Sequence, residues 1–183
     1  PAQDLAEGYL PIPTVRWEQE HFWFAVTAFA AGKPGESALY ARYRIENLST
    51  ETRHITLFLA VRPFQVSPPW QGLNLATGVS PIRQLSYVDR RIRVEPAGKR
   101  IAVLTTPDRF RAATFDQGAL TDDLTQGRLP EREQVEQDPF GYAAGALEYG
   151  WDLRPGETRE VYLRIPFHAA GNNALILPDA DAA

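Results

Sequence analysis

Residues 36–64 read ESALYARYRIENLSTETRHITLFLAVRPF, and this stretch decides the fold class of the chain. Apolar side chains recur at every second position along residues 39–45 and again along residues 55–61, on either side of a polar connection at 47–52. A period of two residues is typical of β-strands, because successive side chains point to opposite faces. The stretch therefore predicts a β-hairpin, and a long loop that carries Trp70 and three prolines follows it at 65–82.

The same alternation recurs on both sides of this hairpin. It predicts strands at 14–18, 21–30 and 100–105 and hairpins at 83–95 and 142–165, each bounded by residues that favour turns. On the strand at 21–30 both faces are apolar, which is typical of a strand that is covered on both sides. About eight to ten strands with short turns predict an all-β fold, an antiparallel β-sandwich whose strands each bury one face against the opposing sheet.

Residues 107–140 differ from the rest of the chain, because alternation is lost there and charge rises. We expect a partly helical or irregular insertion at this place, with a short helix at 119–126. The sandwich itself is predicted as one domain over residues 14–168. Residues 1–13 are expected to form an N-terminal linker or extended segment, and residues 169–183 a C-terminal linker. Because the sequence has no methionine, and hence no initiator of its own, we expect it to be a segment of a longer protein.

Composition narrows the classes of function. The chain has 183 residues, of which 44% are hydrophobic and 23% charged, and this suits a soluble globular domain. The formal net charge of −4 gives no electrostatic basis for binding nucleic acid or an anionic membrane. No run of about 18 apolar residues is present that would insert into a membrane. Because there is no cysteine, disulfides, thiolate zinc sites and cysteine nucleophiles are excluded, and no cofactor is predicted.

Neither the histidines nor the acidic clusters indicate a reaction that the chain would catalyse. His21, His54 and His168 lie at no spacing typical of metal ligands, so surface or structural roles are favoured and no metal site is predicted. The acidic clusters at 122–123 and 131–136 indicate a solvated surface rather than the paired carboxylates of a glycoside hydrolase. No catalytic residue is assigned on this basis.

Two single carboxylates are better candidates for a functional site. Asp116 and Asp138 each lie among apolar residues, in the segments TFDQG at 114–118 and DPFG at 138–141. Burial among such groups is one way in which a catalytic carboxyl acquires a raised pKa. An aspartate before proline or near glycine also shapes turns, so a structural role stays open beside the functional one.

The loop after the first hairpin carries the remaining feature. Phe64, Gln65, Trp70, Gln71 and Asn74 combine flat apolar rings with amide side chains. A sugar-binding surface uses this combination, since rings stack on C–H groups and amides bond to hydroxyls. The alternative is that Trp70 closes an open end of the sandwich or docks against a neighbouring domain. Both interpretations stay open from the residues alone.

Three motifs suggest a family. They are RPFQVSPPWQ at 62–71, ATFDQG at 113–118 and DPFGYA at 138–143. Together they resemble a region of large bacterial proteins of the discoidin, or coagulation factor 5/8 type, domain class. Those proteins are similar to glycoside hydrolases in which a β-sandwich precedes an (α/α)6 helical barrel. The strand-and-turn patterns at 43–47 and 153–157 are similar to the "supersandwich" found there.

This resemblance implies a non-catalytic accessory domain of a carbohydrate-active protein whose parent is a glycoside hydrolase. The acid and base of such enzymes generally come from the helical barrel, so no catalytic residue is carried onto this chain. Other domains of the same polypeptide, and carbohydrate, are then the expected partners, and the loop at 65–74 is expected to border the substrate cleft. The alternatives are an independent carbohydrate-binding module and an enzyme on a sandwich scaffold. A secreted or periplasmic location fits the resemblance.

Overall fold

The computed structural model describes residues 1–63 and 80–168, and this part of the chain consists mainly of β-strands. The strands are β1 (Ala2–Leu5), β2 (Pro13–Glu18), β3 (Phe22–Ala31), β4 (Ala38–Asn47), β5 (Arg53–Val61), β6 (Gln84–Val88), β7 (Arg91–Glu95), β8 (Lys99–Val103), β9 (Arg109–Ala113), β10 (Ala144–Leu153) and β11 (Thr158–Pro166). The helical elements of the described residues are α1 (Leu120–Thr125) and 3₁₀ turns at Ala6–Gly8 and Phe115–Gln117. None of these helices has the length and apolarity that a membrane crossing requires.

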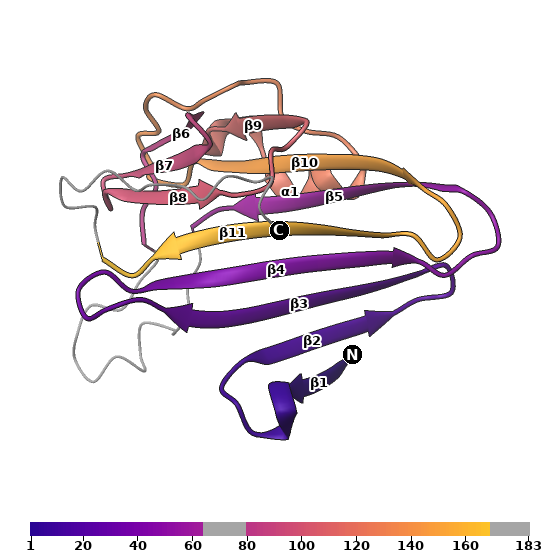
Figure 1. The fold of residues 1–183 in the computed structure, drawn as a ribbon. Coiled ribbons are helices and arrows are strands. Elements are labelled where there is room, and N and C mark those ends of the chain that lie inside the picture. Colours follow the sequence, from indigo (N-terminus) through magenta and orange to yellow (C-terminus); the bar gives the residue numbers. More distant parts are fainter. Residues whose placement is uncertain (64–79, 169–183) are drawn as a thin grey trace, which may run out of the picture. The chain divides into compact units, whose positions relative to one another are not determined.

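The described strands form two antiparallel sheets (Figure 1). The larger sheet has eight strands in the order β1-β2-β3-β4-β11-β8-β7-β6, and the smaller has three in the order β5-β10-β9. The predicted fold class, an all-β antiparallel sandwich, is confirmed. The described residues divide into two compact units: the first holds 1–57, 100–106 and 150–168, and the second holds 58–63, 80–99 and 107–149. The single domain expected over 14–168 stays a prediction.

The strands of the predicted hairpin at 36–64 exist, but they do not pair with each other. β4 belongs to the larger sheet and pairs with β3 and β11, whereas β5 belongs to the smaller sheet and lies beside β10. The predicted hairpin at 142–165 is divided between the two sheets in the same way, as β10 and β11. Both predicted pairings are wrong, because a period of two shows which face of a strand is buried and not which strand lies beside it.

Asn47 lies where the β4–β5 connection meets the β10–β11 connection. Its side chain is fully buried, and Nδ2 donates hydrogen bonds to the carbonyl oxygens of Glu51 and Leu153, both at 2.8 Å. Its backbone N–H donates to the carbonyl of Glu157, and its own carbonyl accepts from the N–H of Gly156. A buried amide whose groups are satisfied in this way ties the two connections to each other.

In the second unit, the hairpin of β6 and β7 packs against β9 and β10. The hairpin turns at Asp89 and Arg90, which both have positive φ and so match the twist of a two-residue turn. The predicted hairpin at 83–95 is therefore confirmed. On β10, a Cβ atom added to Gly145 would lie 2.9 Å from Leu85 Cδ2, so the two layers approach closely because this residue has no side chain.

Two segments hold strands that are not predicted from the sequence. Residues 1–13, expected to form a linker or extended segment, include β1, which pairs along its whole length with β2. The insertion expected at 107–140 contains the predicted short helix as α1, but it also contains β9, which pairs with β10. Alternation does not reveal β9, because the neighbouring residues Ala112 and Ala113 are both buried.

Candidate functional site

The carboxylate of Asp138 organises one surface of the second unit. It is fully buried and accepts three backbone hydrogen bonds, from Phe115 to Oδ2 at 2.7 Å and from Phe140 and Gly141 to Oδ1 at 2.8 and 3.1 Å. The N–H of Asp138 donates in turn to the carbonyl of Arg83. Charge-assisted bonds of this kind satisfy a carboxylate that lies away from water. Segments distant in the sequence are thereby held together at one point.

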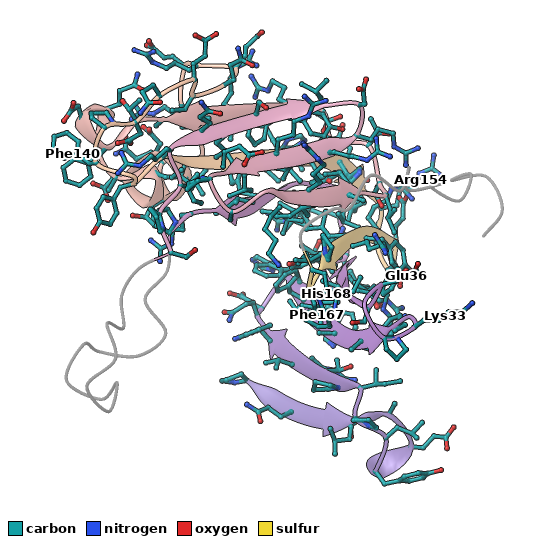
Figure 2. All side chains as sticks on the ribbon, turned by 90° about the vertical axis from the view of Figure 1, so that its left-hand side faces the viewer. Lys33, Glu36, Phe140, Arg154, Phe167 and His168 are labelled. Atoms are coloured by element: carbon teal, nitrogen blue, oxygen red, sulfur yellow. The ribbon has the colours of Figure 1, made fainter. Side chains whose placement is uncertain are left out.

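Three aromatic rings gather at this point, and we call Phe115, Phe140 and Tyr142 the aromatic cluster. The ring centroid of Phe115 lies 5.2 Å from that of Phe140 and 5.6 Å from that of Tyr142, with interplanar angles of 53° and 48°. The exposed fractions of the three residues are 54%, 54% and 45%. Figure 2 shows Phe140 pointing away from the strands of its unit. Large apolar side chains that gather on a surface indicate a binding or docking site, whereas single exposed ones do not.

The backbone beneath the aromatic cluster is fixed by its neighbours. Gly141 has a φ of +76°, and a Cβ atom there would lie 2.9 Å from Cβ of Pro81, so glycine is required. The carbonyl of Gly141 accepts a hydrogen bond from the N–H of Ile82, and Arg83 Nη1 donates to the carbonyl of Pro139 at 2.8 Å. The rings are thus presented by a loop whose conformation is set before a partner binds.

A polar hollow of about 480 Å³ is formed by the residue before Phe115 and by residues that directly precede the motif carrying Phe140. It is lined by Thr114, which directly precedes Phe115, and by residues 132–137, which carry guanidinium, carboxylate and amide groups. Thr114 is held by Gln117, whose Oε1 accepts hydrogen bonds from the N–H and the hydroxyl of Thr114. The groups that line this hollow are able to bond to sugar hydroxyls or to the polar rim of a protein partner.

The two predicted carboxylates have different surroundings. Asp138 is buried and engaged by backbone N–H groups, so it shapes the turn. Asp116 is exposed and lies in the first turn of the 3₁₀ segment Phe115–Gln117. Asp138 therefore holds the backbone that carries the aromatic cluster, whereas Asp116 directly follows Phe115 in the chain and is exposed. The other predicted site residues lie outside the described residues; they are Phe64, Gln65, Trp70, Gln71 and Asn74.

The rings of the aromatic cluster are not among the site residues that the sequence predicts. Phe115 and Phe140 stand in two of the motifs that carry the family resemblance, and each lies beside a residue that shapes a turn. A tight turn leaves a side chain at its tip little room to fold inward. A phenylalanine inside a turn that contains Asp and Gly is therefore the sequence feature that could have identified Phe115 and Phe140 as exposed.

The histidines lie in the first unit. His54 Nδ1 is 2.8 Å from Asp152 Oδ1, and both side chains are exposed. His21 and His54 line a mainly apolar hollow of about 440 Å³ beside β5. His168 Nε2 lies 3.5 Å from Ser37 Oγ. Within residues 1–63 and 80–168, no group of three or more His, Cys, Asp or Glu side chains is arranged to hold a metal ion.

Comparison with known proteins does not assign the chain to a family: no family model matches it, and no curated protein matches its sequence. The structure brings two of the three resemblance motifs together, since the N–H of Phe115 in 113–118 bonds to the carboxylate of Asp138 in 138–143. The third motif, at 62–71, extends beyond residue 63 and so lies mostly outside the described residues. The resemblance to discoidin-type bacterial proteins stays a prediction.

Proposed function

We propose that this chain is a non-catalytic accessory β-sandwich domain of a larger bacterial carbohydrate-active protein. Its aromatic cluster is the surface that packs on a neighbouring catalytic domain and borders the substrate cleft of that domain. One observation carries the proposal: the exposed ring of Phe115 contacts the exposed rings of Phe140 and Tyr142, on a backbone that the buried carboxylate of Asp138 fixes. The class of the parent protein rests on the resemblance of the motifs at 62–71, 113–118 and 138–143.

The aromatic cluster suits a docking surface for two reasons. Phenylalanine and tyrosine are enriched in the cores of interfaces, because each buries a large apolar area with few rotatable bonds. Rings on a fixed loop also lose little entropy when a partner covers them. The interplanar angles of 53° and 48° present ring edges as a ridge rather than one flat platform. A ridge favours insertion into a groove of a protein over stacking on a flat sugar ring.

A second function, that of an independent carbohydrate-binding module, is favoured by the polar hollow. Gln134 and Gln137 supply amides, and Glu133 and Glu136 supply carboxylates that accept hydrogen bonds from hydroxyls. In this alternative, a sugar contacts one ring of the aromatic cluster and bonds to side chains of the hollow. The two functions therefore use the same surface and differ in what covers it.

The test is association with the neighbouring domain of the parent polypeptide, expressed as a separate chain and titrated by calorimetry. Phe140→Ser removes one ring of the aromatic cluster, and we expect association at least about tenfold weaker, because truncation of a central interface aromatic costs about 2 kcal/mol and tenfold corresponds to about 1.4 kcal/mol. Phe167→Ser is the matched control, since Phe167 is 49% exposed and belongs to the first unit. We expect this variant to associate as the wild type does.

Equal affinity of the wild type, Phe140→Ser and Phe167→Ser would overturn the docking role. Oligosaccharide binding by the chain alone, lost in both Phe140→Ser and Gln137→Ala, would replace the docking role with that of a binding module. Far-ultraviolet circular dichroism of every variant establishes that the strands are retained, so that a loss of binding is read as a loss of contact.

A further inference from the structure

One face of the first unit carries a dense set of charged and aromatic side chains. β2, β3, β4 and β11 lie side by side in the larger sheet (Figure 1), and directly opposite residues in an antiparallel pair point to the same face. The register therefore places four arginines on one face of these strands. They are Arg16, Arg42, Arg44 and Arg164. We call this surface the arginine face.

Trp23 on β3 holds two of these arginines. The guanidinium of Arg16, from β2, lies 5.2 Å from the Trp23 ring centroid, and that of Arg44, from β4, lies 5.1 Å from it. A guanidinium at such a distance is attracted by the negative face of the ring. The two cations reach the indole from the strands on either side of β3. Arginine side chains thus cover one of the two apolar faces of β3 and are themselves held in place.

The arginines are only loosely neutralised by carboxylates. Glu160 Oε1 lies 3.8 Å from Arg42 Nη1 and 3.9 Å from Arg44 Nε, and Glu46 Oε2 lies 3.8 Å from Arg44 Nη2. These separations exceed hydrogen-bond distance. Arg44 Nε and Arg164 Nη1 are buried donor atoms without a hydrogen-bond partner. These two atoms are themselves buried, but the side chains of Arg42 and Arg44 are 40% and 39% exposed, so a ligand that brings acceptors is able to reach their guanidinium groups.

We propose that the arginine face binds an acidic oligosaccharide, one in which uronic acid carboxylates stand among neutral, hydroxyl-bearing sugars. A guanidinium pairs with a carboxylate through two parallel hydrogen bonds, and arginine is the side chain suited to that geometry. Sugar hydroxyls find a partner in the Tyr40 hydroxyl, which is partly exposed and accepts from Arg164 Nε at 3.1 Å. The choice of a sugar as the ligand rests on the proposed function, a domain of a carbohydrate-active protein. The present proposal adds which kind of sugar is bound.

The carboxylates of the arginine face select against a denser polyanion. Glu18, Glu46 and Glu160 lie on this face among the four arginines, which leaves a single net positive charge. A ligand with a charge on every residue, such as nucleic acid, would meet these carboxylates and be repelled. A sugar chain that spaces its carboxylates avoids the repulsion, and its hydroxyls are able to donate to the same glutamates.

The test compares two probes that differ by one uronic acid. Xylotetraose that carries a single glucuronic acid, and plain xylotetraose, are titrated into the protein by calorimetry at low ionic strength. We expect the acidic sugar to bind at least about tenfold more tightly, and its advantage to shrink as salt is added. Arg44→Gln should remove most of this difference. Arg159→Gln is the matched control, because Arg159 pairs with Ile45 in the register, faces the other way and is 46% exposed.

Arg16→Gln on β2 tests the same face if Arg44→Gln does not fold. Equal affinity for the two sugars, or no binding of either by the folded wild type, would overturn the proposal. A thymidine oligonucleotide that binds more tightly than the acidic sugar would also overturn it. Failure here is distinguishable from failure of the docking role, because Arg44→Gln is expected to leave association with the neighbouring domain unchanged. Phe140→Ser, conversely, is expected to leave the affinity for the acidic sugar unchanged.

Discussion

Asn47 Nδ2 donates a hydrogen bond to the carbonyl oxygen of Leu153 at 2.8 Å, and this bond joins residues 106 positions apart in the sequence. Asn47 ends β4 and Leu153 ends β10, so the bond links the two strands that lead into the connections between the sheets. The same nitrogen also donates to the carbonyl of Glu51. A single buried amide thus holds both crossing connections in place.

Asn47→Ala is expected to lower the free energy of unfolding by about 1–3 kcal/mol, because the buried carbonyl of Leu153 is left without its donor. Urea unfolding followed by circular dichroism measures the change. Ser49→Ala is the control: its hydroxyl donates to Asn47 Oδ1, but the residue is partly exposed, and we expect a loss below about 1 kcal/mol. An Asn47→Ala protein as stable as Ser49→Ala would contradict the role of the amide.

Asp138→Asn is expected to loosen the aromatic cluster. The amide keeps one acceptor oxygen, but its NH₂ group then faces a backbone N–H of Phe115 or of Phe140, where two donors oppose each other. We expect a loss of about 1–3 kcal/mol of stability, and a weaker near-ultraviolet circular dichroism signal from the rings. Asp116→Asn, at an exposed position, should change stability by no more than about 0.5 kcal/mol. Identical spectra of Asp138→Asn and the wild type would show that the carboxylate does not fix the loop.

The strands were predictable from the sequence, and their partners were not. Residues 39–45 and 55–61 alternate because one side of each strand is buried, and that burial is a property of the strand itself. Pairing of β4 with β11 depends on contacts more than 100 residues apart in the sequence, which no local period records. β9 lacks the alternation because Ala112 and Ala113 are both small enough to be buried side by side in the chain.

The candidate site was predictable only in part. Asp138 stands out because it lies among apolar residues, and the structure buries it, but as the support of a loop. The rings of Phe115, Phe140 and Tyr142 are exposed although apolarity by itself favours burial. Their convergence follows from the bond between Phe115 and Asp138, across 23 residues, and so could not be read from either motif alone.

The pKa of Tyr162, on the arginine face, carries the last prediction. Burial raises this pKa above its ordinary value, and the hydrogen bond that the hydroxyl donates to the carboxylate of Glu160 raises it further. The folded state then keeps the phenolic proton at a pH at which the unfolded chain ionises. The contribution to stability is therefore complete below about pH 10 and is lost as the pH rises through the raised value in the folded state.

Phenolate absorbance measures this titration as the difference between the wild type and Tyr162→Phe. Glu160→Gln removes the negative charge beside the hydroxyl, so we expect the pKa of Tyr162 to fall toward its ordinary value. The loss of stability above about pH 10 should then be smaller and should end at a lower pH than in the wild type. Glu157→Gln is the matched control, because Glu157 pairs with Arg159 and with the N–H of Arg154 at the turn before β11. A titration of Tyr162 that is the same in Glu160→Gln and Glu157→Gln would show that burial alone sets its pKa, and that Glu160 is not held by this hydroxyl.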